Sequence, residues 1–295
     1  MRTPVILLFL FAFVLFPAAA QESSALTPAL LTLQKGNTVI HVFGSIHVGS
    51  GDMYPLPSAV EEAFAEADTL VVELDALEVS SLKAAGIMRK KLGYPRGDSL
   101  DKHLPEETYA ALQAACKDFG LPLSAVRIFK PTVADMLITQ MAAARAGYDG
   151  QNGIDVYFLR KAREAGKTIA PLETLEEQLD ALARIPDHAQ VIMLSRSLED
   201  LGMLTTDLEK LVDVWRRGDL EACYAIEEKD LIDAPGLKPV YDILIAERNR
   251  TMAERLEKLT AGGGTFFVVA GVGHFAGPDS VIEILRQGDF TVERR

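Results

Sequence analysis

The sequence predicts an α/β protein with a mixed, largely parallel central sheet built from both chain ends and a large helical middle region. Three observations support this prediction. Short apolar runs near both ends of the 295-residue chain have the length and composition of buried strands. Two of these runs are separated by a helical pattern, which is typical of a βαβ unit with parallel strands. The stretch from about residue 80 to 260 is mostly helical in its periodicity.

The N-terminal segment has a different character from the rest of the chain. Arg2 is followed by an apolar run over residues 5–16, which is too short to span a membrane, and a small-x-small cleavage motif ends at Ala20. This pattern predicts a signal peptide over residues 1–20, followed by a tether over residues 21–29; the alternative is an uncleaved anchor. No later segment reaches about 18 uninterrupted apolar residues. We therefore expect a periplasmic or secreted protein without a membrane span after signal cleavage.

Composition excludes several classes of protein. The formal charge is −12, 48% of residues are hydrophobic and 24% are charged, which argues against a disordered or fibrous chain. The acidic balance provides no basic face for nucleic acid. Cys116 and Cys223 are too few for a disulfide scaffold. A single bridge between them and two separate buried thiols both remain open from the sequence.

The N-terminal elements follow from local signals. Residues 30–33 and 38–43 flank a Gly/Asn turn and predict a β-hairpin. A helical pattern begins after Pro57, since proline is favoured in the first turn of a helix. Residues 69–74 then form a short, continuously apolar run, which indicates a strand covered on both faces.

The middle and C-terminal elements complete the predicted domain over residues 30–295. A strand candidate at 168–172 is weakened by its proline, whereas 266–270 is the most convincing buried strand, and a helix over 278–287 and a strand over 290–293 follow it. Because neither chain end alone carries enough strands to bury a sheet, we expect the first and last strands to share one. Helices are predicted over 80–166 with breaks at 93–95 and 129–131, over 174–217 with a break at Pro186, and within 235–260.

Polar side chains occur where four of the predicted strands end. These residues are His47, Glu73, Glu173 and His274. In open α/β sheets, ligands bind outside the carboxyl ends of the strands, so we expect the four to share one edge. Both histidines follow a Gly-x-x-His pattern, in which glycine permits a sharp turn and a close approach to a ligand. Imidazole and carboxylate together are the ligands of catalytic divalent cations such as Zn, Mn, Co or Fe.

Other candidates have simpler alternatives. Asp155 lies at the start of a predicted helix and Glu173 lies just before another. The simpler alternative for each side chain is that it caps the helix and has no other role. Arg248 lies in a charged run of a long helix; it either faces solvent or turns inward as a fixed cation that stabilises an oxyanion. Residues 271–276 match the dinucleotide-binding pattern G-x-G-x-x-A, but too little chain follows for the rest of a nucleotide-binding fold.

Seven short motifs carry a family resemblance. They are FGSIHVG at 43–49, YPLP at 54–57, VEL at 72–74, GID at 153–155, LET at 172–174, ERNR at 247–250 and GVGH at 271–274. In this order they resemble the TraB/GumN family, which is similar to Tiki-type metalloproteases and more remotely to erythromycin esterases and haem-binding ChaN-like proteins. The resemblance implies that His47, Glu73 and His274 form the active centre and that Arg248 is a further site residue. It also implies a bound divalent metal, which is Mn or Co in Tiki-like members. The ligand types in the sequence allow Zn as an alternative.

The leading hypothesis is a periplasmic metal-dependent hydrolase, with a peptidase as its most specific form. Glu173 or Asp155 would be a further ligand or the general base, and Arg248 would stabilise the oxyanion. One alternative is a metal-free, esterase-like hydrolase in which histidine is the base. Another is a non-catalytic protein that binds haem, metal or a peptide signal. The expected partner is a peptide or small molecule, and the oligomeric state stays open.

Overall fold

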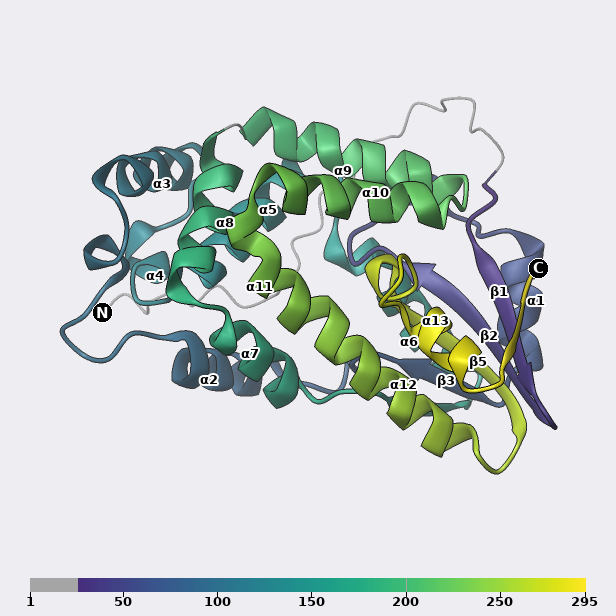
Figure 1. Ribbon diagram of the computed structural model, residues 1–295. Helices are drawn as coiled ribbons and strands as arrows, with labels where there is room; N and C mark the ends of the chain where they lie inside the picture. Colours follow the sequence, from purple (N-terminus) through teal and green to yellow (C-terminus); the bar gives the residue numbers. More distant parts are fainter. Residues whose placement is uncertain (1–25, 200) are drawn as a thin grey trace.

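The computed structural model describes residues 26–199 and 201–295 and confirms the predicted α/β class (Figure 1). The predicted signal peptide over residues 1–20 and most of the tether lie outside these residues. The described part contains one six-stranded sheet in the order β4-β3-β5-β2-β1-β6. The strands are β1 Leu30–Lys35, β2 Thr38–Ser45, β3 Thr69–Val72, β4 Thr168–Pro171, β5 Gly264–Gly271 and β6 Thr291–Arg294.

The helices of the described residues fill the predicted helical regions. They are α1 Ser58–Glu66, α2 Ser81–Leu92, α3 Glu106–Asp118, α4 Leu123–Val126, α5 Pro131–Arg145, α6 Ile154–Glu164, α7 Leu175–Arg184, α8 Asp187–Glu199, α9 Leu201–Arg216, α10 Leu220–Asp233, α11 Lys238–Tyr241, α12 Glu247–Thr260 and α13 Val281–Gln287. In Figure 1, helices α2, α3, α4, α5, α7 and α8 form a helical region beside the sheet.

The sheet is largely parallel, as predicted. Strands β4, β3, β5 and β2 are parallel neighbours, whereas β1 is antiparallel to both β2 and β6. The parallel pairing of β2 with β5 extends to Ser45 opposite Gly271, and β1 pairs with β6. Both chain ends therefore contribute to one sheet, which confirms that prediction. Strand β4 lies at an edge, where Pro171 can lack an N–H without breaking the interior of the sheet.

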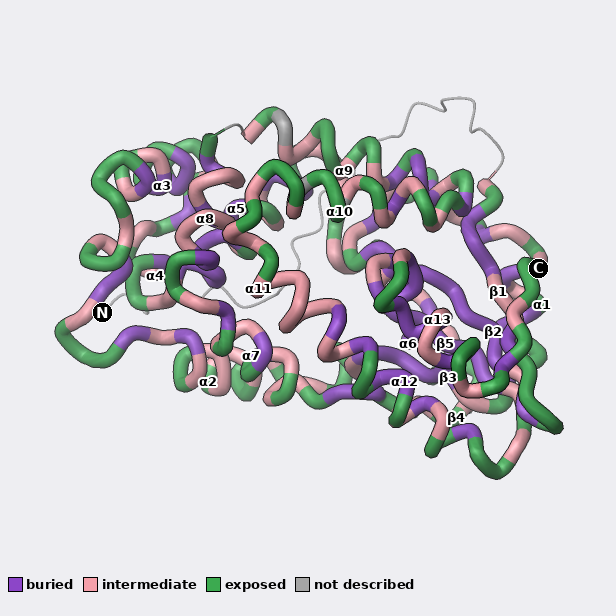
Figure 2. Tube along the Cα trace, in the orientation of Figure 1, coloured by how far each residue is buried: buried purple, intermediate pink, exposed green. Residues whose placement is uncertain are grey.

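Helices cover both faces of the sheet, so its central strands are buried in Figure 2. Successive residues of a strand point to opposite faces. Phe43 and Phe267 therefore pack on one face against α1 and α6, whereas Val42 and Val268 pack on the other against α12 and α13. The continuous apolarity of the predicted strands reflects this double cover.

Helix boundaries agree with the predicted breaks in most places. Helix α2 ends at Leu92 and α5 begins at Pro131. The predicted long helix within 235–260 contains a π-helical turn over Asp242–Ala246 between α11 and α12. Such turns occur frequently at functional sites. The last helix starts later than predicted, because the side chain of Ser280 caps it.

The two cysteines belong to different helices. Cys116 in α3 and Cys223 in α10 are both buried, and no disulfide links them. The interpretation of two separate buried thiols is therefore confirmed. Among the described residues, none of the helices combines the length and apolarity needed to cross a bilayer.

Candidate active site

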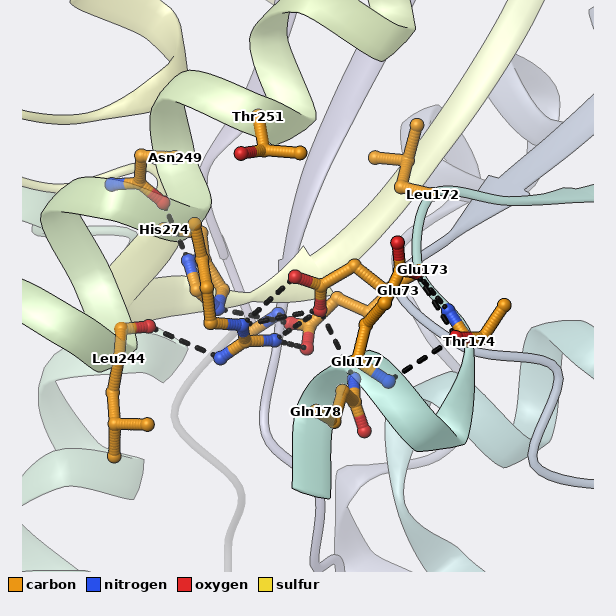
Figure 3. Close-up of polar contacts among 12 residues, drawn as sticks. Glu73, Leu172, Glu173, Thr174, Glu177, Gln178, Leu244, Asn249, Thr251 and His274 are labelled. Carbon is orange, nitrogen blue, oxygen red and sulfur yellow. Dashed lines mark hydrogen bonds and ion pairs between the residues drawn. The ribbon is translucent and has the colours of Figure 1, made fainter. Parts of the chain in front are cut away.

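The carboxyl ends of the parallel strands bring the predicted site residues together. Glu73 directly follows β3, and Glu173 follows β4 after one intervening residue. His47 lies two residues beyond β2, and His274 ends the 3-10 turn that follows β5. Because β2, β5, β3 and β4 are successive neighbours in the sheet, these residues share one edge. Glu73, Glu173 and His274 gather at the centre of Figure 3.

Arg248 turns inward from α12 and joins the two glutamates. Its guanidinium donates hydrogen bonds to Glu173 at 2.6, 3.0 and 3.1 Å and to Glu73 at 3.1 Å. A further N–H of the guanidinium donates to the main-chain oxygen of Leu244 at 3.1 Å. The side chain of Arg248 is 16% exposed, so the alternative of a solvated charge run is wrong for this residue. Arg248 and both glutamates form a compact, mostly buried ionic group.

Glu73 is ionised despite its burial. Burial alone would raise the pKa of its carboxyl group. The protonated forms of His274 and His47, the guanidinium of Arg248 and the N–H of Gly271 at 2.6 Å together outweigh burial and lower this pKa to about 2. Burial also lowers the pKa of His274. When the His274 ring is neutral, Arg248 and the Gly271 N–H still donate hydrogen bonds to the Glu73 carboxylate.

His274 is buried and held by a chain of hydrogen bonds. Its Nδ1 lies 2.5 Å from Oδ1 of Asn249, and Nδ2 of Asn249 donates to the main-chain oxygen of Asp279 at 2.8 Å. The opposite ring atom, Nε2, lies 3.5 Å from Oε1 of Glu73. His274 therefore presents its Nε2 edge to the carboxylate.

His47 is the exposed member of the site, with 65% of its side chain accessible. Its Nδ1 lies 2.9 Å from Oδ2 of Asp155, and the hydroxyl of Ser45 donates to Oδ1 of the same carboxylate at 2.7 Å. The negative charge of Asp155 raises the pKa of His47 above its ordinary value. Asp155 thus orients His47 from the side away from Glu73.

Gly271 marks the space that the site residues share. A Cβ atom on this residue would lie 3.2 Å from Oε1 of Glu73 and 3.2 Å from Nε2 of His47. Those two atoms therefore border the same space, which the missing side chain leaves open. A larger residue at the end of β5 would enter this space and press on both atoms.

The GID motif at 153–155 contacts the backbone of the loop that carries His47. The N–H of Ile154 donates to the main-chain oxygen of Ile46 at 3.1 Å. A Cβ on Gly153 would lie 2.4 Å from the main-chain oxygen of His47, so only glycine permits this contact. The start of α6 therefore packs directly on the loop that carries His47.

Helix capping does not explain the two acidic candidates. Thr174 caps α7 through its own side chain, and Gly153 occupies the N-cap position of α6. Glu173 binds Arg248 and Asp155 binds His47, so the capping alternative is wrong for both. Asn249 was missed as a site residue, although it lies inside the ERNR motif and is fully buried.

Within residues 26–199 and 201–295, no group of three or more His, Cys, Asp or Glu side chains has a metal-binding arrangement. The chemistry of the local donors nevertheless suits a divalent cation. A Cβ on Gly271 would lie 3.2 Å from both Oε1 of Glu73 and Nε2 of His47, and Nε2 of His274 lies 3.5 Å from the same oxygen of Glu73. Nitrogen and oxygen donors of these types bind Zn, Mn and Co.

Fold and site together define an α/β protein with an imidazole and carboxylate centre at strand ends. The family model of the TraB/PrgY/gumN family matches residues 29–294. The chain therefore belongs to this family.

Similarity to known proteins extends over most of the chain. The uncharacterised protein YbaP of Escherichia coli is 26% identical over 271 residues, which cover 91% of this chain and 96% of YbaP. The metalloprotease TIKI1 of Danio rerio is 25% identical over 304 residues, which cover 86% of this chain and 60% of TIKI1. No solved structure matches. The chain is thus a distant relative of proteins named metalloproteases.

Proposed function

We propose that this protein is a metal-dependent hydrolase that cleaves peptides, with His47, Glu73 and His274 as ligands of a divalent cation, Mn, Co or Zn. The observation that carries the proposal is the gap beside Gly271, which is bordered by Nε2 of His47 and Oε1 of Glu73. Nε2 of His274 lies 3.5 Å from the same carboxylate oxygen. Similarity to proteins named metalloproteases favours hydrolysis of peptides over other reactions.

The bound cation would lower the pKa of a water molecule towards about 7 and polarise a substrate carbonyl. The residues of the chain have separate tasks. The N–H of Gly271 fixes one oxygen of Glu73, and Arg248 fixes the other. Glu173 accepts most of the hydrogen bonds of Arg248 and so holds the guanidinium beside the site.

Arg248 would stabilise negative charge that develops on the substrate. Its N–H groups are largely engaged by Glu73, Glu173 and the Leu244 carbonyl. Its contribution would therefore come from its positive charge at short range in a partly buried site. The N-terminal pattern over residues 1–20 supports placing this activity in the periplasm or outside the cell.

The test combines metal reconstitution with substitution of the proposed ligands. The mature chain is purified without chelator, and cleavage of a peptide library is followed by mass spectrometry before and after chelation and after addition of Mn²⁺, Co²⁺ or Zn²⁺. We expect chelation to abolish cleavage and one of these ions to restore it. His47→Ala, Glu73→Gln and His274→Ala should each lose cleavage while circular dichroism shows an unchanged fold.

His188→Ala is the matched control, because His188 is exposed on α8 and takes no part in the site. Its cleavage rate should equal that of the unmodified chain. Full activity in chelator would contradict the metal role and favour the metal-free, esterase-like alternative. Stoichiometric binding of haem, metal or peptide without any turnover would favour a non-catalytic binding protein.

A further inference from the structure

We propose that Asp155 and Asn249 are positioning residues that keep a proton on Nδ1 of both imidazoles, so that Nε2 of each ring is the atom offered to a cation. The consequence for metal binding rests on the proposed function. The hydrogen bonds themselves do not, because they can be measured in the metal-free protein.

The orientation of Asn249 follows from its second partner. A main-chain carbonyl can only accept a hydrogen bond, so the Asn249 atom 2.8 Å from the Asp279 oxygen must be the amide nitrogen. The amide oxygen then faces Nδ1 of His274 at 2.5 Å. Because an amide oxygen is also only an acceptor, Nδ1 of His274 must carry the proton. In the neutral ring, Nε2 is left with a lone pair directed towards Glu73.

Asp155 applies the same constraint to His47. An ionised carboxylate has no proton to donate, and its Oδ2 lies 2.9 Å from Nδ1 of His47. Nδ1 must therefore be the donor. The Ser45 hydroxyl donates to the other oxygen at 2.7 Å, which fixes the carboxylate plane. The mostly exposed ring of His47 thus obtains its orientation from a carboxylate that is itself held in place.

The two arrangements have one consequence. A metal-binding histidine coordinates through its unprotonated nitrogen, and the partner on the other nitrogen selects which one that is. Here the partners come from α6 and α12, on different parts of the chain, and both select Nε2. Loss of such a partner typically lowers metal affinity by about 10–100-fold.

The structure allows a test that separates a positioning role from a merely structural one. Asp155→Ala removes the oxygen that accepts the hydrogen bond from Nδ1 of His47. The neutral ring is then free to carry its proton on either nitrogen, so Nε2 is no longer selected as the unprotonated atom. We expect Co²⁺ affinity, measured by calorimetry and by the visible absorption of Co²⁺, to fall by about 10–100-fold.

Asp155→Asn should bind Co²⁺ more tightly than Asp155→Ala. Its amide oxygen can accept from Nδ1 of His47 while its NH₂ group donates to Oγ of Ser45, because a hydroxyl oxygen also accepts hydrogen bonds. Equal Co²⁺ affinities in Asp155→Asn and Asp155→Ala would overturn the positioning role of Asp155. Asp187→Asn is the matched control, since this side chain is 80% exposed and pairs with Lys130 rather than with a residue of the site; its Co²⁺ affinity should be unchanged.

The position of the proton on the His274 ring can be measured directly by NMR of metal-free protein labelled with ¹⁵N-histidine. The two-bond ¹H–¹⁵N pattern should show the proton of the neutral His274 ring on Nδ1, and Asn249→Ala should give a mixture of tautomers. A proton on Nε2 in the unmodified chain would overturn the proposal. If Asn249→Ala does not fold, the Co²⁺ affinities of the Asp155 variants still test the proposal.

The outcomes also distinguish this proposal from the proposed function. If the unmodified chain binds Co²⁺ and both Asp155→Ala and Asn249→Ala bind it equally well, the positioning role is overturned and the metal site stands. If the unmodified chain binds none of Mn²⁺, Co²⁺ and Zn²⁺, the metal role fails. The His274 tautomer then still decides the hydrogen-bond arrangement, with Nδ1–H supporting it and Nε2–H overturning it.

Discussion

Gly271 shows how one missing side chain shapes the site. Its N–H binds Oε1 of Glu73 at 2.6 Å, while its Cα faces the gap between that oxygen and Nε2 of His47. The first role would survive substitution, because every residue except proline has an N–H. The second role would not, because a methyl group would occupy the shared space.

We therefore expect Gly271→Ala to remain folded, to bind Co²⁺ less tightly and to show a matching loss of any metal-dependent cleavage. The added Cβ would meet both site atoms at 3.2 Å, so His47 or Glu73 must move aside. Calorimetric titration and thermal unfolding monitor the two properties separately. Gly86→Ala is the control, because a Cβ there has nothing within 4 Å; wild-type affinity in Gly271→Ala would contradict this account.

Arg248 is the residue on which the charge balance of the site depends. Replacement by methionine keeps most of the volume and removes the positive charge between Glu73 and Glu173. Breaking a buried ion pair in this way typically costs about 3–5 kcal/mol, because uncompensated charge stays buried. We expect Arg248→Met to lower the free energy of unfolding at pH 7 by about that amount.

The pH dependence of this loss has a definite sign. A depressed folded-state pKa, about 2 for Glu73, contributes stability above the unfolded value near 4.5 and loses it as the pH falls towards 2. The stability difference between Arg248→Met and the unmodified chain should therefore be largest above pH 5 and shrink in acid. Urea unfolding at several pH values measures it, and a difference independent of pH would refute the explanation.

At the scale of elements, the packing of α5 against α8 contains an uncompensated polar group. Asp135 of α5 is buried, and one of its carboxylate oxygens has no hydrogen-bond partner among the described residues. Burial raises the pKa of this carboxyl, although a hydrogen bond with Ser197 of α8 opposes the shift. The helical region therefore contains an acid whose charged form is unfavourable.

We expect Asp135→Asn to stabilise the protein by about 1 kcal/mol at neutral pH. A raised folded-state pKa gives stability that is complete below the unfolded value, near 3.8, and that is lost as the pH rises through the folded value. The advantage of the asparagine variant should thus grow from acid to neutral pH. Chemical denaturation at pH 3.5 and pH 7 provides the comparison, and an advantage confined to low pH would contradict it.

At the scale of the whole molecule, α9 is tied to the site through the single tryptophan of the chain. The indole N–H of Trp215 donates to the main-chain oxygen of Gly44 at 2.8 Å, and its ring packs edge-on against Phe43. Gly44 opens the motif that ends at His47. A helix from the middle of the chain therefore supports the strand that carries the first histidine.

Trp215→Phe should lower the free energy of unfolding by about 3 kcal/mol, because a buried carbonyl loses its donor and a smaller ring leaves a cavity. Denaturation followed by circular dichroism measures the loss. In the unmodified chain, the buried indole should fluoresce at short wavelength until the protein unfolds. An unchanged unfolding midpoint in the variant would show that the hydrogen bond to Gly44 contributes little.

The sequence predicted the strands and many helix boundaries well, since these depend on local signals. Continuous apolar runs predict strands buried on both faces, and a Gly/Asn turn predicts the β1–β2 hairpin. The π-helical turn over 242–246 and the late start of α13 were not predicted. The first has no local sequence signature, and the second depends on which of several residues provides the cap.

The sequence by itself determined the fold class, the order of the strands along the chain and the polar residues at strand ends, because periodicity, turn chemistry and residue type are local properties. Only the tertiary structure decided that Arg248 faces inward, that Asp155 lies behind His47 and that Asn249 holds His274. These contacts join residues far apart in the chain. Their burial and hydrogen bonds exist only after the sheet has brought those segments together.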